Sequence, residues 1–143
     1  MTKVLNTPQV DTQLLWAKLK VFEIDDLDSN FRFSHRLANE NLWSKEYTLR
    51  VIEEYKKFMF LCCVCPPVTP SIDVDECWHL HMIYTHQYWK DLCKDILNID
   101  IHHGPTKGGK EEDIKYELQY EKTLHFYSSY FGTPPADIWP SSK

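Results

Sequence analysis

The segment "KEYTLRVIEEYKKFMFLCC", residues Lys45 to Cys63, determines the fold class of this chain. Its apolar residues recur every three or four positions, and they are Tyr47, Val51, Ile52, Tyr55, Phe58, Met59 and Cys62. This spacing follows the turn of an α-helix and collects the apolar side chains on one face. The next stretch, "CPPVTPS", contains three prolines, which cannot continue a helix. We therefore predict a helix from Lys45 to about Cys63.

Similar spacing predicts further helices on both sides of this segment. They are expected at Val10 to Phe22 with Asp11 or Thr12 as N-cap, at Phe31 to Leu42, at Asp73 to Lys90 with Ser71 or Asp73 as N-cap, and at Glu111 to Tyr130. Asn98 to Gly109 reads as a loop, and "FGTPPADIWPSSK" reads as an irregular tail whose Ile138-Trp139 folds back onto the body. No β-alternation is present, so we expect an all-α class: a compact bundle of about five helices.

Composition and charge narrow the class of protein. The 143 residues fit one domain, 1–143, and the 43% apolar and 26% charged content is typical of a soluble globular protein. A net charge of −5 argues against a general nucleic-acid binder, which needs a basic face. The longest apolar run, Phe58 to Val64, is too short to span a membrane. Met1 to Val10 lacks a signal-peptide pattern, so we expect a cytoplasmic protein that contacts neither nucleic acid nor membrane.

Five cysteines are present, and three of them, Cys62, Cys63 and Cys65, form a tight cluster. One interpretation is a thiolate metal site. Against it, the chain has no second cysteine pair at zinc-ribbon spacing, and free cysteine is among the most often buried residue types. We therefore expect these thiols to fill the core.

The stretch "ECWHLHMIYTHQYW", Glu76 to Trp89, is rich in histidine and aromatic residues. On a regular helix, Asp75 and His79 lie about 40° apart around the axis and could share one metal ion. His79 and His81, however, lie about 200° apart and cannot face the same ion. The spacing permits two small sites, one site that uses a single histidine, or a distorted helix that turns both inward.

A second histidine pair, His102-His103, follows in the loop sequence "IHHGP". A loop histidine that joins two helix ligands is a common way to supply three protein ligands and leave one position open. Two histidines with a carboxylate would suit zinc or non-haem iron(II), and spacing does not choose between these metals. The alternative is that the histidines are hydrogen-bonded residues of an aromatic core or an interface.

Several of these motifs together resemble a known family. "SIDVDECWHLHMIYTHQY", then "IHHGP", then "YEKTLHFYSSYFG" is similar to the glycine-rich domain-containing protein-like family, with its WHxH, HHxP and FG elements in the same order. "LANENLWSKEYTLRVIEEYKKFMFL" resembles an upstream stretch of that family. The resemblance covers roughly residues 31–139. This chain has only four glycines and lacks the glycine-rich tail of plant members.

The resemblance implies a small helical domain with a histidine motif. It does not imply any particular reaction. The motif positions of this chain are Asp75, Trp78, His79, His81, Thr85, Tyr88, His102, His103 and Pro105. Cys93 falls one place late for the cysteine of the pattern. Because the pattern includes both His79 and His81, we hypothesise that the helix starts or bulges near His81. We expect metal ligands at Asp75 and the four motif histidines, with Trp78, Tyr88 and Cys93 around them.

Two functions from different classes follow from the sequence. The first is a metal-dependent enzyme, hydrolytic or oxidative, that acts on a small molecule or peptide, with Glu76 as general base. The second is a non-catalytic helical module whose histidines hold a structural ion, or none, and whose aromatic surfaces contact a protein. The sequence does not decide between enzyme and module, and it does not identify a protein partner.

Overall fold

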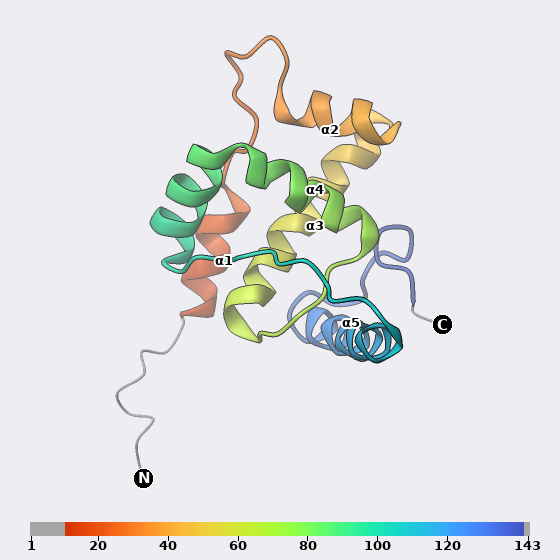
Figure 1. The fold of residues 1–143 in the computed structure, drawn as a ribbon. Coiled ribbons are helices and arrows are strands. Elements are labelled where there is room, and N and C mark those ends of the chain that lie inside the picture. Colours follow the sequence, from red (N-terminus) through yellow and green to blue (C-terminus); the bar gives the residue numbers. More distant parts are fainter. Residues whose placement is uncertain (1–10, 142–143) are drawn as a thin grey trace.

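The computed structural model describes residues 11–141 and contains only helices as regular secondary structure in that range (Figure 1). The six helices are α1 (Thr12–Lys20), α2 (Phe33–Asn41), α3 (Lys45–Val64), α4 (Ile72–Ile83), η2 (His86–Leu97) and α5 (Lys110–Phe131). The predicted all-α class is confirmed. The sequence predictions for Met1 to Val10, and for the last two residues of the tail, fall outside the described residues.

Helix α3 is the central element, and it contacts α1, α2, α4 and α5 (Figure 1). It begins where the Ser44 hydroxyl accepts a hydrogen bond from the Tyr47 amide at 3.1 Å, an N-cap interaction. Val51, Phe58 and Met59 of its apolar stripe are completely buried. Each such side chain stabilises the fold by roughly 1.5–3 kcal/mol relative to exposure. The predicted helix from Lys45 is confirmed and ends at Val64, just before the prolines.

The helix predicted from Asp73 to Lys90 is wrong in its second half. Helix α4 starts after Ser71, whose hydroxyl accepts from the Val74 amide at 3.2 Å, so Ser71 and not Asp73 is the N-cap. The helix passes through His81 without a bulge and ends at Ile83, because the backbone of Tyr84 leaves the helical region at ψ 70°. The chain then continues as η2, a π-helix.

The spacing of the buried residues explains the wider turns of η2. Its buried side chains are Tyr88, Leu92, Cys93 and Leu97, which stand at positions i, i+4, i+5 and i+9. A π-helix closes its hydrogen bonds from i to i+5, so it brings all four to one face. An α-helix would rotate the last of them away from the core.

The C-terminal tail folds back onto α3, as predicted, and buries Ile138 and Trp139. The buried carboxylate of Glu54 in α3 holds this contact. Its Oε1 accepts from the Tyr127 hydroxyl at 2.6 Å and from the Trp139 indole at 3.0 Å. Its Oε2 pairs with Lys57 at 3.1 Å. One carboxylate thus joins α3, α5 and the tail.

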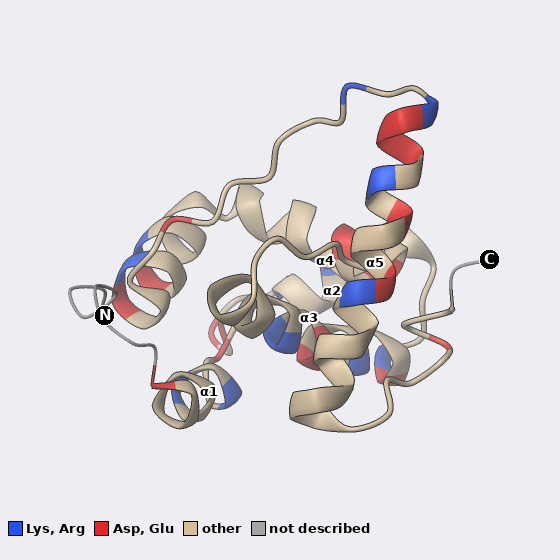
Figure 2. Cartoon of the chain, turned by 90° about the horizontal axis from the view of Figure 1, so that it is seen from below, with Lys and Arg blue, Asp and Glu red and all other residues tan. Residues whose placement is uncertain are grey.

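Helix α5 is mostly exposed, and charges of both signs alternate along it (Figure 2). Its first turn carries Glu111, Glu112 and Asp113, which interact favourably with the positive end of the helix dipole. The loop of residues 98–109 runs from η2 across the body to this end of α5 (Figures 1 and 2). Within residues 11–141, none of the helices combines the length and apolar character needed to cross a membrane. The cytoplasmic location stays a prediction.

Replacing Glu54 by alanine leaves the Tyr127 hydroxyl, the Trp139 indole and Lys57 without their shared acceptor. We expect Glu54→Ala to lower the free energy of unfolding by roughly 3–5 kcal/mol, measured by urea denaturation. The control is Glu40→Ala, because the Glu40 side chain is exposed and its partner Arg36, 4.0 Å away, is exposed as well. That change should stay within about 0.5 kcal/mol. Equal effects of the two substitutions would contradict the role of Glu54.

Candidate functional site

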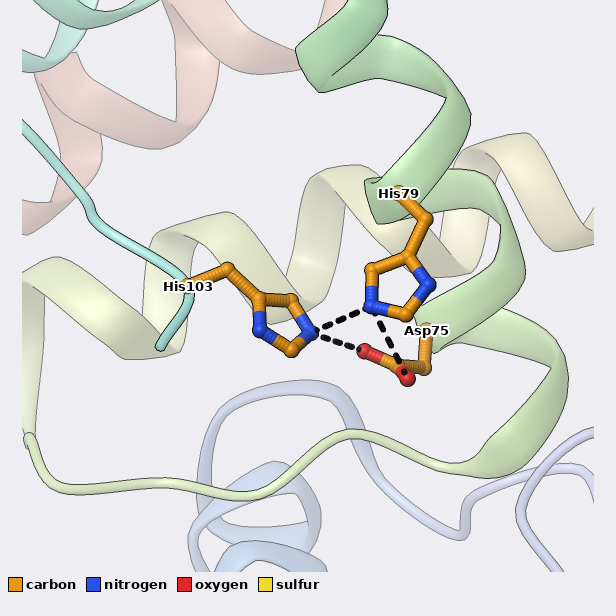
Figure 3. Close-up of side chains that lie close together, drawn as sticks. All are labelled: Asp75, His79 and His103. Atoms are coloured by element: carbon orange, nitrogen blue, oxygen red, sulfur yellow. Dashed lines mark hydrogen bonds and ion pairs between the residues drawn. The ribbon is translucent and has the colours of Figure 1, made fainter. Parts of the chain in front are cut away.

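Three side chains from two distant segments converge beside α4 (Figure 3). Asp75 and His79 lie one turn apart on α4, and the loop brings His103 to them. His103 Nε2 is 2.7 Å from Asp75 Oδ1 and 2.8 Å from His79 Nε2, and His79 Nε2 is 3.5 Å from Asp75 Oδ2. One ligand atom from each residue lies within 4.8 Å of the others, so these three could hold a metal ion.

While both imidazoles are neutral, hydrogen bonding satisfies only one of the two close contacts of His103 Nε2. A neutral imidazole nitrogen either donates one proton or offers one lone pair, yet His103 Nε2 faces both a carboxylate and a second imidazole nitrogen. The other nitrogen, His103 Nδ1, lies 3.3 Å from the Gly104 carbonyl and can donate its proton there. That tautomer leaves a lone pair on Nε2, directed toward Asp75. A cation among the three ligand atoms would satisfy all of them together.

The three residues line a cavity of about 830 Å³ that is open to solvent. Its remaining lining residues come from the proline-rich segment, α4, the loop and α5, and they are Val68, Thr69, Pro70, Ser71, Ile72, Trp78, His102, Gly104, Pro105, Thr106 and Tyr116. The volume lies in the range of sites for small ligands. The cluster is therefore accessible to a ligand.

A buried hydrogen-bond chain holds the histidine loop against α4. The Trp78 indole donates to the Tyr88 hydroxyl at 2.9 Å, and that hydroxyl donates to the Ile101 carbonyl at 2.6 Å. The Trp78 ring also lies against the His103 ring, with centroids 4.3 Å apart. Trp78 and Tyr88, which we expected near the metal, thus connect α4, η2 and the loop two residues before His103.

The cysteines lie outside this cluster. Cys62 and Cys93 are buried, while Cys63 and Cys65 are half-buried and pack against the core. Burial raises the pKa of all four thiols, which disfavours the thiolate that a metal ligand needs. Cys93 was expected around the site, and it lies in the core face of η2 instead.

His81 is not brought into the cluster, contrary to the sequence-based expectation. It is completely buried on the opposite side of α4. Its Nδ1 lies 2.6 Å from the Tyr55 hydroxyl and its Nε2 lies 2.7 Å from Gln87 Oε1. Both ring nitrogens are therefore engaged, and α4 is regular, so the two-residue step from His79 turns His81 into the core. Burial lowers the pKa of His81 to about 4.

The remaining expected site residues lie at the edge of the cluster or outside it. His102 lines the cavity, but its ring packs beside Trp89 with centroids 5.1 Å apart, and it is not among the three converging residues. Glu76, the expected general base, is exposed on α4 and does not line the cavity.

Comparisons with known proteins show one distant similarity. Glycine-rich domain-containing protein 1 of Arabidopsis thaliana is 24% identical to this chain over 112 residues, and the match covers 71% of this chain. The chain spans 13% of the length of that protein. No family model and no solved structure matches the chain. The similarity supports a distant relationship to this protein, in agreement with the resemblance noted from the sequence.

The lowered pKa of His81 predicts a dependence of stability on pH. The ring titrates near pH 6.5 in the unfolded chain and near pH 4 in the folded chain. Stability is therefore fully present above pH 6.5 and falls by up to about 3 kcal/mol as the pH drops to about 4. Urea denaturation of the metal-free protein should show this loss, and His81→Gln should reduce it. Parallel pH profiles for the two proteins would refute the assignment, and His86→Gln, an exposed histidine, is the control.

The hydrogen-bond chain through the Tyr88 hydroxyl predicts a second effect on stability. Tyr88→Phe leaves the Trp78 indole and the Ile101 carbonyl unsatisfied, at about 1–3 kcal/mol for each buried group. We expect a loss of at least about 2 kcal/mol in the free energy of unfolding, with faster hydrogen exchange in residues 101–104. Tyr84→Phe is the matched control, because the Tyr84 hydroxyl bonds only to exposed Arg36 at 3.2 Å among the contacts described. If the two variants behave alike, the hydrogen-bond chain through Tyr88 does not hold the loop.

Proposed function

We propose that this chain binds one divalent transition-metal ion, zinc or iron(II), through Asp75, His79 and His103. The observation that carries the proposal is the convergence of two imidazole nitrogens and a carboxylate oxygen from α4 and the loop. Two histidines and one carboxylate are the ligand set of catalytic zinc sites and of non-haem iron(II) sites.

The three side chains lie close enough together to surround an ion of this size. Zinc lies about 2.0–2.1 Å from its nitrogen ligands, so the ligand atoms of a tetrahedral site are about 3.3 Å apart. His79 Nε2 lies 3.5 Å from Asp75 Oδ2, whereas His103 Nε2 is closer than this to Asp75 Oδ1, at 2.7 Å, and to His79 Nε2, at 2.8 Å. The side chain of His79 is 53% exposed, so a small rotation of this ring can widen its separation from His103.

The resemblance of the histidine motifs to the glycine-rich domain-containing protein-like family adds support. Asp75, His79 and His103 each fall on a position of that pattern. We propose that these three positions are the ligands of the motif, whereas His81 belongs to its structural part. The WHxH element then combines one ligand, His79, with one core histidine, His81.

Three protein ligands leave coordination positions open, and the cluster borders a cavity. This arrangement suits a metal-dependent enzyme, hydrolytic or oxidative, better than a closed structural site. His102 lines the same cavity, so we propose it in place of Glu76 as the group that accepts a proton there. Small molecules or peptides are the ligands that such a cavity admits.

The alternative function is a non-catalytic module in which the same three side chains only hydrogen-bond to one another. The 2.7 and 2.8 Å separations, which are ordinary hydrogen-bond lengths, favour this alternative. It predicts no stoichiometric metal, and it predicts that substitution of His103 loosens the loop.

Metal titration distinguishes the two functions. Protein purified without a histidine tag should bind one Zn²⁺ or Co²⁺ per chain by calorimetry and elemental analysis. His79→Ala and His103→Ala should each weaken binding by at least about 100-fold, because each removes a direct ligand. His102→Ala and His86→Ala are the controls and should retain binding. Absence of stoichiometric metal in the wild type, or equal losses in the controls, would overturn the proposal.

A further inference from the structure

We infer that the cavity beside Asp75, His79 and His103 binds an elongated carboxylic acid with an apolar body, whose carboxylate coordinates the metal. This inference rests on the proposed metal site. The reasons are the distribution of charge in the cavity, its apolar walls and its continuation along α5.

Charge in the cavity is confined to one place. Asp75, His79 and His103 cluster there, with His102 next to them in the chain. None of the described residues that line the cavity is lysine or arginine. Two neutral imidazoles and one carboxylate leave a divalent cation with a net charge of about +1. Within this first cavity an anionic group of a ligand therefore finds its counter-charge only at the metal, and a carboxylate supplies oxygen ligands that zinc and iron(II) accept.

The remaining walls are largely apolar and require an apolar ligand body. The apolar and aromatic lining residues include Pro70, Ile72, Trp78, Pro105 and Tyr116. Ile72, the first residue of α4, is 79% exposed. Its side chain gains little from folding, and a ligand in the cavity would remove it from water.

The apolar surface continues beyond the first cavity. A second hollow of about 640 Å³ shares Thr69, Pro70, Ser71, Ile72 and Tyr116 with the first. From α5 it adds Ile114, which is half exposed, and Tyr120, together with the charged residues Lys110, Asp113 and Glu117. The two hollows therefore adjoin at Ile72 and Tyr116, and the metal cluster borders only the first of them. This shape favours an elongated ligand over a compact one.

Decanoate is a suitable probe, and two compounds serve as its controls. Acetate has the carboxylate of decanoate without the alkyl chain, and 1-decanol has the alkyl chain without the carboxylate. The Co²⁺-loaded full chain is titrated with each compound, followed by the visible spectrum of the metal and by calorimetry. Decanoate should change the spectrum and bind at least about 10-fold more tightly than acetate. 1-Decanol should leave the spectrum unchanged.

Two protein variants test where the alkyl chain of decanoate binds. Ile72→Gln should weaken decanoate binding by roughly 5-fold or more, because it removes apolar wall. Ile83→Gln is the matched control: Ile83 lies on the same helix, is 72% exposed and lines neither hollow. Both variants should bind Co²⁺ as the wild type does, because neither position is a ligand.

The outcomes separate this inference from the metal proposal. If Co²⁺ binds but decanoate binds no more tightly than acetate, the inference is overturned and the metal site stands. Equal effects of Ile72→Gln and Ile83→Gln, or equal decanoate binding to metal-free protein, also overturn it. If Co²⁺ itself does not bind, the metal site and the inference both fail.

Discussion

The burial of His81 between α3 and η2 fixes the rotation of α4 about its axis, and the candidate site depends on that rotation. The ring is held by the Tyr55 hydroxyl on one side and by Gln87 on the other. Because residues two apart on a helix lie about 200° apart, this burial directs His79 away from the core. Asp75, one turn earlier, follows His79 to the same face. A hydrogen-bonded histidine in the core thus orients the two side chains that α4 contributes to the cavity.

The fold could be predicted from the sequence where its signals are local. The apolar stripe of α3, its Ser44 cap and the prolines after it are all contained in one stretch of chain. The change from α4 to η2 was missed, although the i, i+4, i+5 and i+9 spacing of the buried residues from Tyr88 to Leu97 fits a π-helix and not an α-helix. The backbone of Tyr84, where the two helices separate, carries no glycine or proline to mark the break.

The part of the candidate site that depends on local helical spacing could also be predicted from the sequence. Helical spacing alone places Asp75 and His79 on one face. It could not choose between His102 and His103, because that choice depends on how the loop is anchored. The Tyr88 hydroxyl binds the Ile101 carbonyl, and this contact between η2 and the loop sets which of the two following rings reaches α4. Such a long-range contact leaves no periodic trace in the sequence.

The cavity itself results from the segment that cannot be helical. Prolines keep residues 66–70 out of helix, so the Thr69 amide finds its partner in α5, where it donates to the Thr123 hydroxyl at 2.9 Å. This bond ties the segment to α5 and leaves a hollow between the first turn of α4, the loop and α5. Ile72 remains exposed beside this hollow and Ile114 beside the adjoining one, so neither side chain gains free energy from folding. This exposed apolar surface beside Asp75, His79 and His103 is the surface that the inferred ligand would cover.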